Sequence, residues 1–473
     1  MPSPENHSAL REPAGPGILK RYAYLLSARW VREAFQAVFL IYLARHSATT
    51  YGEFMLALAM GQILLLVAEF GLNLPLVPML SQKDGHPGEA LSRVSLLKTA
   101  LLLAASLGAV GFIHWQDYAR PLQQVMLVLS AGVGLEALAS TFFVACQVEG
   151  RQDLEGKIKV LGAGLGYGYG LLTLILGAAP LVVACFKLIE TLVNLAGGAA
   201  LIFSQSRFRP RWPSLRGLGA TLQRSLVFAL MEVAAITYNR ANIFFLQRYA
   251  GAEGVAQYSA TWLMVEGVSS LVSTLLLQSV MFPLFVRLWE VDRSRISRLA
   301  QDTARWLLAA ALPVMFILFM ESDRLITLIY GAHYQEAVWL QKYLAVTVVA
   351  AFLHNLAALL MVSMRRERLL LVFYLAGLIF NLLWCSLAMP VRPLLGAALA
   401  MVLTKGVVAL MTVSYIQRRL GLITGRSLLQ LAAAALGGVS CYLLGMNHLP
   451  REVAEALALT PILGLGWHWW RAR

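Results

Sequence analysis

The sequence predicts an all-α polytopic membrane protein with about fourteen transmembrane helices, arranged as two six-helix lobes and an appended helical hairpin. The first observation behind this prediction is composition. Of the 473 residues, 59% are hydrophobic and 14% are charged, which is far from the balance of a soluble domain. The second observation is the placement of basic residues between the hydrophobic segments, and the third is an internal repeat.

Hydrophobic segments of membrane-spanning length follow one another along almost the whole chain. A helix rises about 1.5 Å per residue, so about twenty apolar residues cross the roughly 30 Å hydrocarbon core of a bilayer. Residues 397–415 illustrate the pattern, because all of them except Lys405 are apolar or small and neutral. The predicted spans are 18–44, 51–80, 94–114, 122–147, 158–179, 180–203, 219–246, 255–286, 304–330, 337–364, 369–390, 394–417, 427–447 and 453–470.

The basic residues indicate how the chain is oriented in the membrane. The formal net charge is +14, which in a soluble protein would suggest a nucleic-acid partner. Here Lys and Arg concentrate in every second connection, as at Arg207, Arg365 and Arg418. The positive-inside rule then places these connections and both termini in the cytoplasm. Residues 1–17 are expected to form a short cytosolic tail, and the predicted partner of the charge is a membrane rather than nucleic acid.

Two pairs of segments indicate that the architecture is duplicated. The segment that starts at Tyr51 resembles the one that starts at Tyr258, since both run about thirty residues into an end that contains proline. Residues 177–195 resemble 396–414, which places Lys187 and Lys405 at corresponding positions. Repeats of this kind are common in transporters. The repeat divides the chain into an N-lobe at 18–206, a C-lobe at 207–420 and an appended hairpin at 421–473, with a pseudo-two-fold axis along the membrane normal.

Several ionisable residues lie inside the predicted spans, where each charge costs about 2.5–3.5 kcal/mol even on lenient insertion scales. Some can pair on one helix face, because Arg29 and Glu33 are four residues apart and Lys187 and Glu190 are three apart. Glu69 lies close to Gly71 and Pro75, which favours a capping or helix-break role. The other residues of interest are Arg32, Glu136, Glu232, Arg240, Glu266 and Lys405.

Cations near the membrane midplane favour an anionic substrate, because Arg and Lys form strong charge-assisted hydrogen bonds with phosphate. Snorkelling to the headgroups is the alternative for arginines near helix ends. Lys405 lies too near the middle of its span to snorkel, and its main alternative is an ion pair with a glutamate from another helix. The candidates for binding a substrate diphosphate are Arg29, Arg32, Lys187, Arg240 and Lys405.

Carboxylates at similar depth admit two interpretations. They could bind a coupling Na⁺ or H⁺, or they could neutralise the buried bases. The residues concerned are Glu136, Glu232 and Glu266. The sequence does not decide between these roles, and it predicts no other cofactor.

Other chemistries find little support in the sequence. There is no Walker A run and no HExxH pattern, so neither ATP hydrolysis nor a metalloprotease is predicted. The four cysteines have no paired spacing and lie in apolar stretches, which argues against a disulfide framework or a zinc site. The glycine-rich run at 162–170 lies within a span and predicts close helix packing. We therefore expect no catalytic residues, no metal site and no enzyme activity.

Three stretches carry a resemblance to a known family. They are YGEFMLALAMGQILLLVAEFGL, ANIFFLQRYAGAEGVAQYSATWLMVEGVSSLVSTLLLQSVMFPLF and LITLIYGAHYQEAVWLQKYLAV. In order and spacing they resemble the Wzx-like polysaccharide flippases (O-antigen transporters) of the multidrug/oligosaccharidyl-lipid/polysaccharide (MOP) superfamily, over roughly 20–420.

The resemblance implies two lobes around a central cavity in the bacterial inner membrane. It also implies that the protein moves undecaprenyl-diphosphate-linked oligosaccharide from the cytoplasmic to the outer leaflet by alternating access. The purpose would be biosynthesis of a surface polysaccharide such as the O-antigen of lipopolysaccharide, with a glycan polymerase as a partner. The rival functions are a lipid II flippase, a cation-coupled multidrug exporter and, from another class, a membrane glycan polymerase or ligase.

Overall fold

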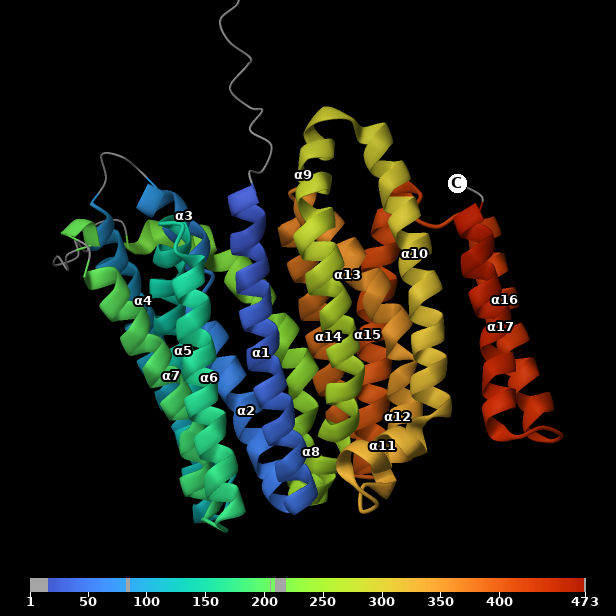
Figure 1. The fold of residues 1–473 in the computed structure, drawn as a ribbon, viewed down its shortest axis with the longest axis horizontal. Helices are drawn as coiled ribbons and strands as arrows, with labels where there is room; N and C mark the ends of the chain where they lie inside the picture. Colours follow the sequence, from blue (N-terminus) through green and yellow to red (C-terminus); the bar gives the residue numbers. More distant parts are fainter. Residues whose placement is uncertain (1–15, 82–85, 205, 209–217, 472–473) are drawn as a thin grey trace, which may run out of the picture. The chain divides into compact units, whose positions relative to one another are not determined.

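The computed structural model describes residues 16–81, 86–204, 206–208 and 218–471 (Figure 1). These residues form helices and short connections, and no strand occurs among them. The predicted all-α class is confirmed. The predicted cytosolic tail at 1–17 lies almost entirely outside the described residues.

The chain divides into two compact units. The first, here called the N-unit, comprises Met1–Leu43 and Met60–Ala229, and the second, the C-unit, comprises Ala44–Ala59 and Leu230–Arg473. The division in the chain falls after Ala229, whereas the repeat predicts a lobe boundary after residue 206. The segment Ala44–Ala59 packs with the C-unit although it lies early in the sequence.

The N-unit is built mainly from consecutive helices of membrane-spanning length. Helix α7 packs along both α5 and α6, and α4 packs on α5. Proline begins α4 and α7 and occupies the second position of α5, where a missing N–H costs nothing. The helices are α1 (Pro16–His46, up to Leu43), α2 (Ala48–Glu69, from Met60), α3 (Asn73–Ser81), α4 (Pro87–Trp115), α5 (Arg120–Val148), α6 (Gln152–Ile175), α7 (Pro180–Phe203), η1 (Ser206–Phe208) and the start of α8 (Leu218–Val272).

The glycine-rich run lets α6 approach α7 closely. A Cβ at Gly162 would lie 2.6 Å from Oδ1 of Asn194, and a Cβ at Gly166 would lie 2.7 Å from Cβ of Glu190. Gly164 meets nothing within 4 Å. The glycines that line the contact are therefore four residues apart, which confirms the predicted helix packing.

The C-unit repeats part of this packing pattern. Helix α15 packs along α13 and α14, as α7 does along α5 and α6. The long helix α8 breaks at Gly251, whose φ of 66° and ψ of −172° suit only glycine. The elements after that break are η2 (a π-helix, Ser273–Met281), α9 (Phe282–Val291), α10 (Arg293–Met320), α11 (Ser322–Tyr330), α12 (Gln335–Ala345), α13 (Thr347–Ser363), α14 (Glu367–Ala388), α15 (Pro393–Leu420), α16 (Gly425–Met446) and α17 (Arg451–Arg471).

The C-terminal hairpin of α16 and α17 docks on the rest of the C-unit through α17. Ala458 and Ile462 pack against Leu312 and Phe316 of α10. At the end of the hairpin, the Arg451 guanidinium forms two hydrogen bonds of 2.6 Å with the Asp323 carboxylate. An apolar contact with α10 and an ion pair with α11 thus hold the hairpin in place.

The number of membrane spans differs from the prediction. Among the described residues, ten helices are long and apolar enough to cross a membrane, or eleven if the bent pair α12 and α13 counts as one span. One of the ten is the 54-residue stretch Ser225–Gln278, which runs through the break at Gly251. The predicted count of fourteen is not confirmed.

Candidate functional site

Four charged side chains of the N-unit meet where α1, α5 and α7 pack together. Nε of Arg32 donates to Glu190 at 2.6 Å, and its Nη2 donates to Glu136 at 2.8 Å. The ammonium of Lys187 donates to Glu190 at 2.7 Å and also to Glu136. We call Arg32, Glu136, Lys187 and Glu190 the N-unit charge cluster. Each cation contacts both carboxylates. With two cations and two carboxylates, the cluster carries no formal net charge.

The depth of this cluster explains why its charges pair so completely. The Glu190 side chain is fully buried and that of Lys187 is 5% exposed, whereas Arg32 and Glu136 are 26% and 22% exposed. An unpaired charge at such a position would lose its hydration without compensation. The predicted pairing of Lys187 with Glu190 is confirmed. Arg32, which has no obvious partner nearby in sequence, takes both of its partners from other helices.

Three of the predicted charged residues lie at exposed positions instead. Arg29 and Glu33 are exposed on α1, and the described side chains show no ion pair between them, so this predicted pair is wrong. Glu232 is exposed on α8 and is not a member of the N-unit charge cluster. The structure therefore does not bury these three residues with the cluster.

Sequence reasoning missed a second buried cation in the N-unit. Lys98 of α4 is fully buried, and its ammonium donates to Asn73 at 2.7 Å, to the Ala137 carbonyl at 2.8 Å and to Ser140 at 3.0 Å. The Ser140 hydroxyl in turn donates to Glu69 at 2.7 Å. Lys98 was detectable, because it lies inside the predicted span 94–114. Its role here is to fix the break between α2 and α3.

Glu69 ends α2 at this break, as its position near Gly71 and Pro75 predicts. The backbone of Phe70 has a φ of 44° and that of Gly71 has a φ of 62°, so the helix direction changes there. Asn73, at the start of α3, donates to the Glu69 carboxylate at 3.3 Å. The predicted helix-break role is confirmed.

In the C-unit, the ammonium of Lys405 on α15 donates to Glu266 on α8 at 2.6 Å. The Lys405 side chain is 11% exposed and that of Glu266 is 32% exposed. The ion pair with a glutamate from another helix is therefore present, and so is the cavity-facing position that the depth of Lys405 predicts. Lys405 also lines a cavity, described below.

Arg240 of α8 is the buried cation of the C-unit that is least satisfied. The residue is 5% exposed, and its guanidinium carbon lies 3.8 Å from the centroid of the Trp262 ring. Its Nε and Nη1 have no hydrogen-bond partner within the described part of the chain. Snorkelling would require an exposed head group, so that interpretation is wrong for Arg240. A cation–π contact supplies part of the missing stabilisation.

Two asparagines flank Arg240 and complete a polar strip on α8. Nδ2 of Asn242 donates to the Tyr258 hydroxyl at 2.6 Å, and Nδ2 of Asn239 donates to the Ala235 carbonyl at 2.9 Å. The Oδ1 atoms of both asparagines are buried without a partner among the described residues. This strip thus has unused hydrogen-bonding capacity.

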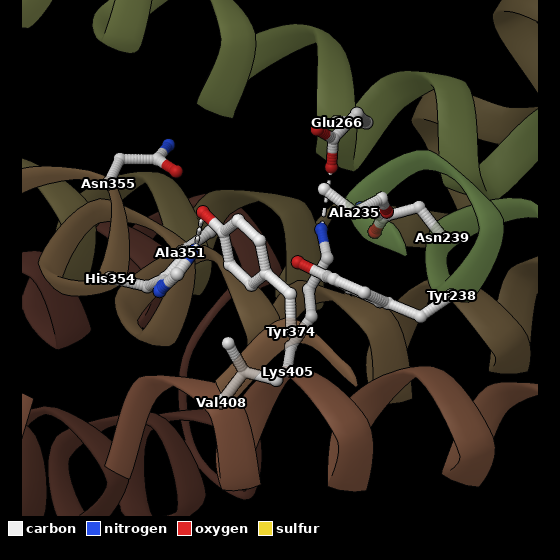
Figure 2. Close-up of a pocket in the computed structure, with 10 residues that line it drawn as sticks. All are labelled: Ala235, Tyr238, Asn239, Glu266, Ala351, His354, Asn355, Tyr374, Lys405 and Val408. Carbon is white, nitrogen blue, oxygen red and sulfur yellow. Dashed lines mark hydrogen bonds and ion pairs between the residues drawn. The ribbon is translucent and has the colours of Figure 1, made fainter. Parts of the chain in front are cut away.

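A cavity of about 170 Å³ lies beside this strip within the C-unit (Figure 2). That is far above the roughly 10–15 Å³ that one water needs. Figure 2 shows the Tyr374 ring between the imidazole of His354 and the Glu266–Lys405 pair, and the Tyr238 ring beside Lys405. The lining residues are Ala235, Tyr238, Asn239, Glu266, Ala351, His354, Asn355, Tyr374, Lys405 and Val408.

His354 is held by hydrogen bonds on both ring nitrogens. Nδ1 lies 3.1 Å from Oγ1 of Thr412, and Nε2 lies 3.2 Å from the Tyr374 hydroxyl. The Thr412 hydroxyl can donate to the Val408 carbonyl, 2.9 Å away, and accept from the ring. With the proton on Nδ1, Nε2 accepts from Tyr374. This arrangement satisfies a neutral imidazole.

Comparison with known proteins places this architecture in a family. Residues 43–339 match a family described as polysaccharide biosynthesis protein. The chain belongs to this family. No curated protein sequence matches the chain.

Solved structures of MOP superfamily transporters have the same fold as this chain. The lipid II flippase MurJ in an inward closed conformation superposes with a TM-score of 0.76 at 11% identity, covering 95% of this chain and 99% of MurJ. An inward-facing multidrug resistance MATE transporter gives 0.65 at 13% identity, covering 82% and 94%. A MOP transporter from Pyrococcus furiosus gives 0.57 at 14% identity, covering 86% and 95%. The predicted resemblance is confirmed for the polysaccharide biosynthesis family and for the fold.

Proposed function

We propose that the protein is a flippase for lipid-linked oligosaccharide. It moves an undecaprenyl-diphosphate-linked substrate from the cytoplasmic to the outer leaflet of the bacterial inner membrane by alternating access, for biosynthesis of a surface polysaccharide such as the O-antigen. The observation that carries this proposal is the family match over residues 43–339 on a fold that transporters share. The activity is transport rather than catalysis, and a glycan polymerase at the outer face is the partner that would use the product.

The diphosphate of such a substrate needs positive partners within the membrane, and Arg240 is the strongest candidate. A guanidinium forms a planar set of donors that suits phosphate oxygens, and two of the Arg240 nitrogens are unused within the described part of the chain. The ammonium groups of Lys187 and Lys405 and the Arg32 guanidinium already hold carboxylates. A diphosphate can bind those three cations only if it displaces glutamates, and Arg29 is available without displacement because it is exposed.

The paired carboxylates supply a route to ion coupling. Glu136 holds Arg32 and Lys187, and Glu266 holds Lys405. A coupling H⁺ or Na⁺ bound at either carboxylate would weaken its ion pair and free a cation for an anionic substrate. We propose that Glu136 and Glu266, rather than the exposed Glu232, take this role.

Depletion of the protein in its native bacterium tests the proposed function. Lipid-linked oligosaccharide should accumulate in the cytoplasmic leaflet, and the wild-type gene should restore export. The Arg240→Gln variant should restore export poorly at equal abundance. The matched control is Glu33→Gln, which removes an exposed charge and should restore export fully. Depletion without any accumulation of lipid-linked oligosaccharide would contradict the proposal.

A lipid II flippase is the second candidate, because MurJ superposes over 95% of this chain with a TM-score of 0.76. Complementation separates the two functions. A lipid II flippase would support growth of a bacterium that lacks its own, while an oligosaccharide flippase would not. A multidrug exporter, the third function, would instead change the resistance of the host to cationic drugs.

A further inference from the structure

The cavity of the C-unit has a charge balance that limits what it can bind. Among its described lining residues, the charged side chains are Glu266 and Lys405, which neutralise each other at 2.6 Å. The hydrogen bonds of His354 satisfy a neutral ring. A diphosphate or a cationic drug would need an uncompensated charge of opposite sign. The cavity therefore suits a neutral ligand.

Hydrogen-bonding groups without a protein partner face the same lining. Oδ1 of Asn239 is buried and unpaired among the described residues, and the amide of the half-buried Asn355 also lines the cavity. Glu266 pairs with Lys405 through Oε2, which leaves Oε1 outside that bond. Buried polar groups are normally satisfied by protein, water or ligand. Donors and acceptors side by side match hydroxyl groups, because each hydroxyl both donates and accepts.

Aromatic rings form another part of the lining. The centroids of Tyr238 and Tyr374 are 6.0 Å apart and the rings are tilted by 50°. The Tyr374 hydroxyl is engaged by His354, so its ring supplies apolar surface (Figure 2). Pockets for small molecules combine aromatic surface with a few placed polar groups in this way. A sugar ring, with apolar C–H faces and an edge of hydroxyls, is complementary to both features.

We propose that the C-unit cavity binds a neutral sugar ring of the transported oligosaccharide. This inference rests on the proposed function and adds to it a subsite distinct in charge from the one for the diphosphate. The Glu266 side chain is 32% exposed and that of Lys405 is 11% exposed, so Glu266 is the more accessible member of the pair. Before a coupling ion binds, the Glu266–Lys405 pair keeps the cavity neutral and contributes a carboxylate oxygen to the sugar hydroxyls.

Binding of small probes to the purified full-length chain tests the subsite. Neutral methyl hexopyranosides should bind in saturation-transfer NMR, and inorganic pyrophosphate and tetraphenylphosphonium should not displace them. Asn355→Ala should weaken glycoside binding about fivefold, the factor for one ordinary hydrogen bond. Asn447→Ala, an exposed asparagine at the end of α16, is the matched control and should leave binding unchanged. Tyr238→Leu provides a second variant if Asn355→Ala does not fold.

Several results would overturn the inference. These are the absence of glycoside binding, glycoside binding that neither cavity variant weakens, and displacement of the glycoside by either charged probe. The flippase proposal is tested separately by accumulation of lipid-linked oligosaccharide on depletion. If the oligosaccharide accumulates but glycosides do not bind, the sugar subsite alone is wrong. If cavity-dependent glycoside binding occurs without accumulation, the flippase proposal fails, and with it the assignment of the cavity to a transported sugar.

Discussion

The buried charges of the two units differ in how completely they are paired. In the N-unit, Arg32 and Lys187 each contact both Glu136 and Glu190. In the C-unit, Lys405 has one carboxylate partner, and Arg240 has two nitrogens without any partner within the described residues. The cavity described above is lined by residues of the C-unit. Every charge of the N-unit cluster therefore has a partner of opposite sign, whereas Arg240 in the C-unit keeps two donor nitrogens without a hydrogen-bond partner among the described residues.

The lysines of the two units correspond in the repeat, but their partners do not. Lys187 is on α7, which packs along α5 and α6, and its partners come from α5 and from α7 itself. Lys405 is on α15, which packs along α13 and α14, and its partner comes from α8. A lysine at a corresponding place can thus serve a closed network in one unit and border a cavity in the other.

The largest effect is expected from Glu190→Gln in the N-unit. This change leaves Arg32 and Lys187 to share the single carboxylate of Glu136, and breaking a buried ion pair typically costs about 3–5 kcal/mol. Thermal unfolding of the purified protein should show a strong loss of stability. Glu33→Gln is the control, because Glu33 is exposed. Equal stability of the two variants would show that the N-unit cluster is not structural.

The double variant Lys187→Met with Glu190→Gln sharpens this result. It removes one charge of each sign and leaves Arg32 paired with Glu136 at 2.8 Å. We expect the double variant to regain more than half of the stability that Glu190→Gln loses, because replacing a buried ion pair with uncharged groups is often nearly neutral. The same unfolding measurement checks this expectation. Additive losses from the two changes would mean that Lys187 and Glu190 act independently.

A smaller effect is expected from Glu266→Gln in the C-unit. Glu266 is about one third exposed, so water can partly solvate the Lys405 ammonium that it leaves behind. We expect a loss of about 1–2 kcal/mol after allowance for solvent screening. Unfolding of Glu266→Gln beside Glu190→Gln measures the difference between the units directly. If Glu266→Gln lost as much stability as Glu190→Gln, the buried charges of the two units would not differ in their contribution to stability.

The smallest effect is expected at the ion pair that holds the C-terminal hairpin, outside the membrane-spanning helices. Hydrogen bonds from Arg451 hold the pKa of Asp323 well below its usual range. Since Asp323 is 48% exposed, the pair should contribute less than about 1 kcal/mol. That contribution is complete above the unfolded pKa of about 3.9 and is lost as the pH falls through the lower folded pKa.

The variant Asp323→Asn measures this contribution. It should be slightly less stable than the wild type at neutral pH, and the difference should disappear in strong acid. Asp302→Asn is the control, because the Asp302 carboxylate is 51% exposed and lies 3.9 Å from Arg305. A stability difference that persists unchanged at low pH would show that Asp323 acts through something other than its charge.

The sequence predicts local features of this molecule better than long-range ones. The Lys187–Glu190 pair and the packing of the glycine-rich run follow from helical spacing, and both occur. The contacts of Arg32 with Glu136 and Glu190 join residues 104 and 158 positions apart, so helical spacing cannot reveal them. Glu266 and Lys405 are 139 positions apart, so the sequence predicts their ion pair only as one of two interpretations for Lys405. Lys98 is visible as a charge inside a predicted span, but its contacts with Asn73 and Ser140 of other helices do not follow from helical spacing.

Transport in reconstituted vesicles tests the central claim most directly. Lipid-linked oligosaccharide would be incorporated together with the purified protein, and a membrane-impermeant sugar-modifying reagent would report the fraction of substrate in the outer leaflet over time. The wild type should make inner-leaflet substrate accessible, and Arg240→Gln should do so much more slowly. Identical accessibility in wild-type vesicles and in protein-free vesicles, with correctly folded protein present, would contradict the account.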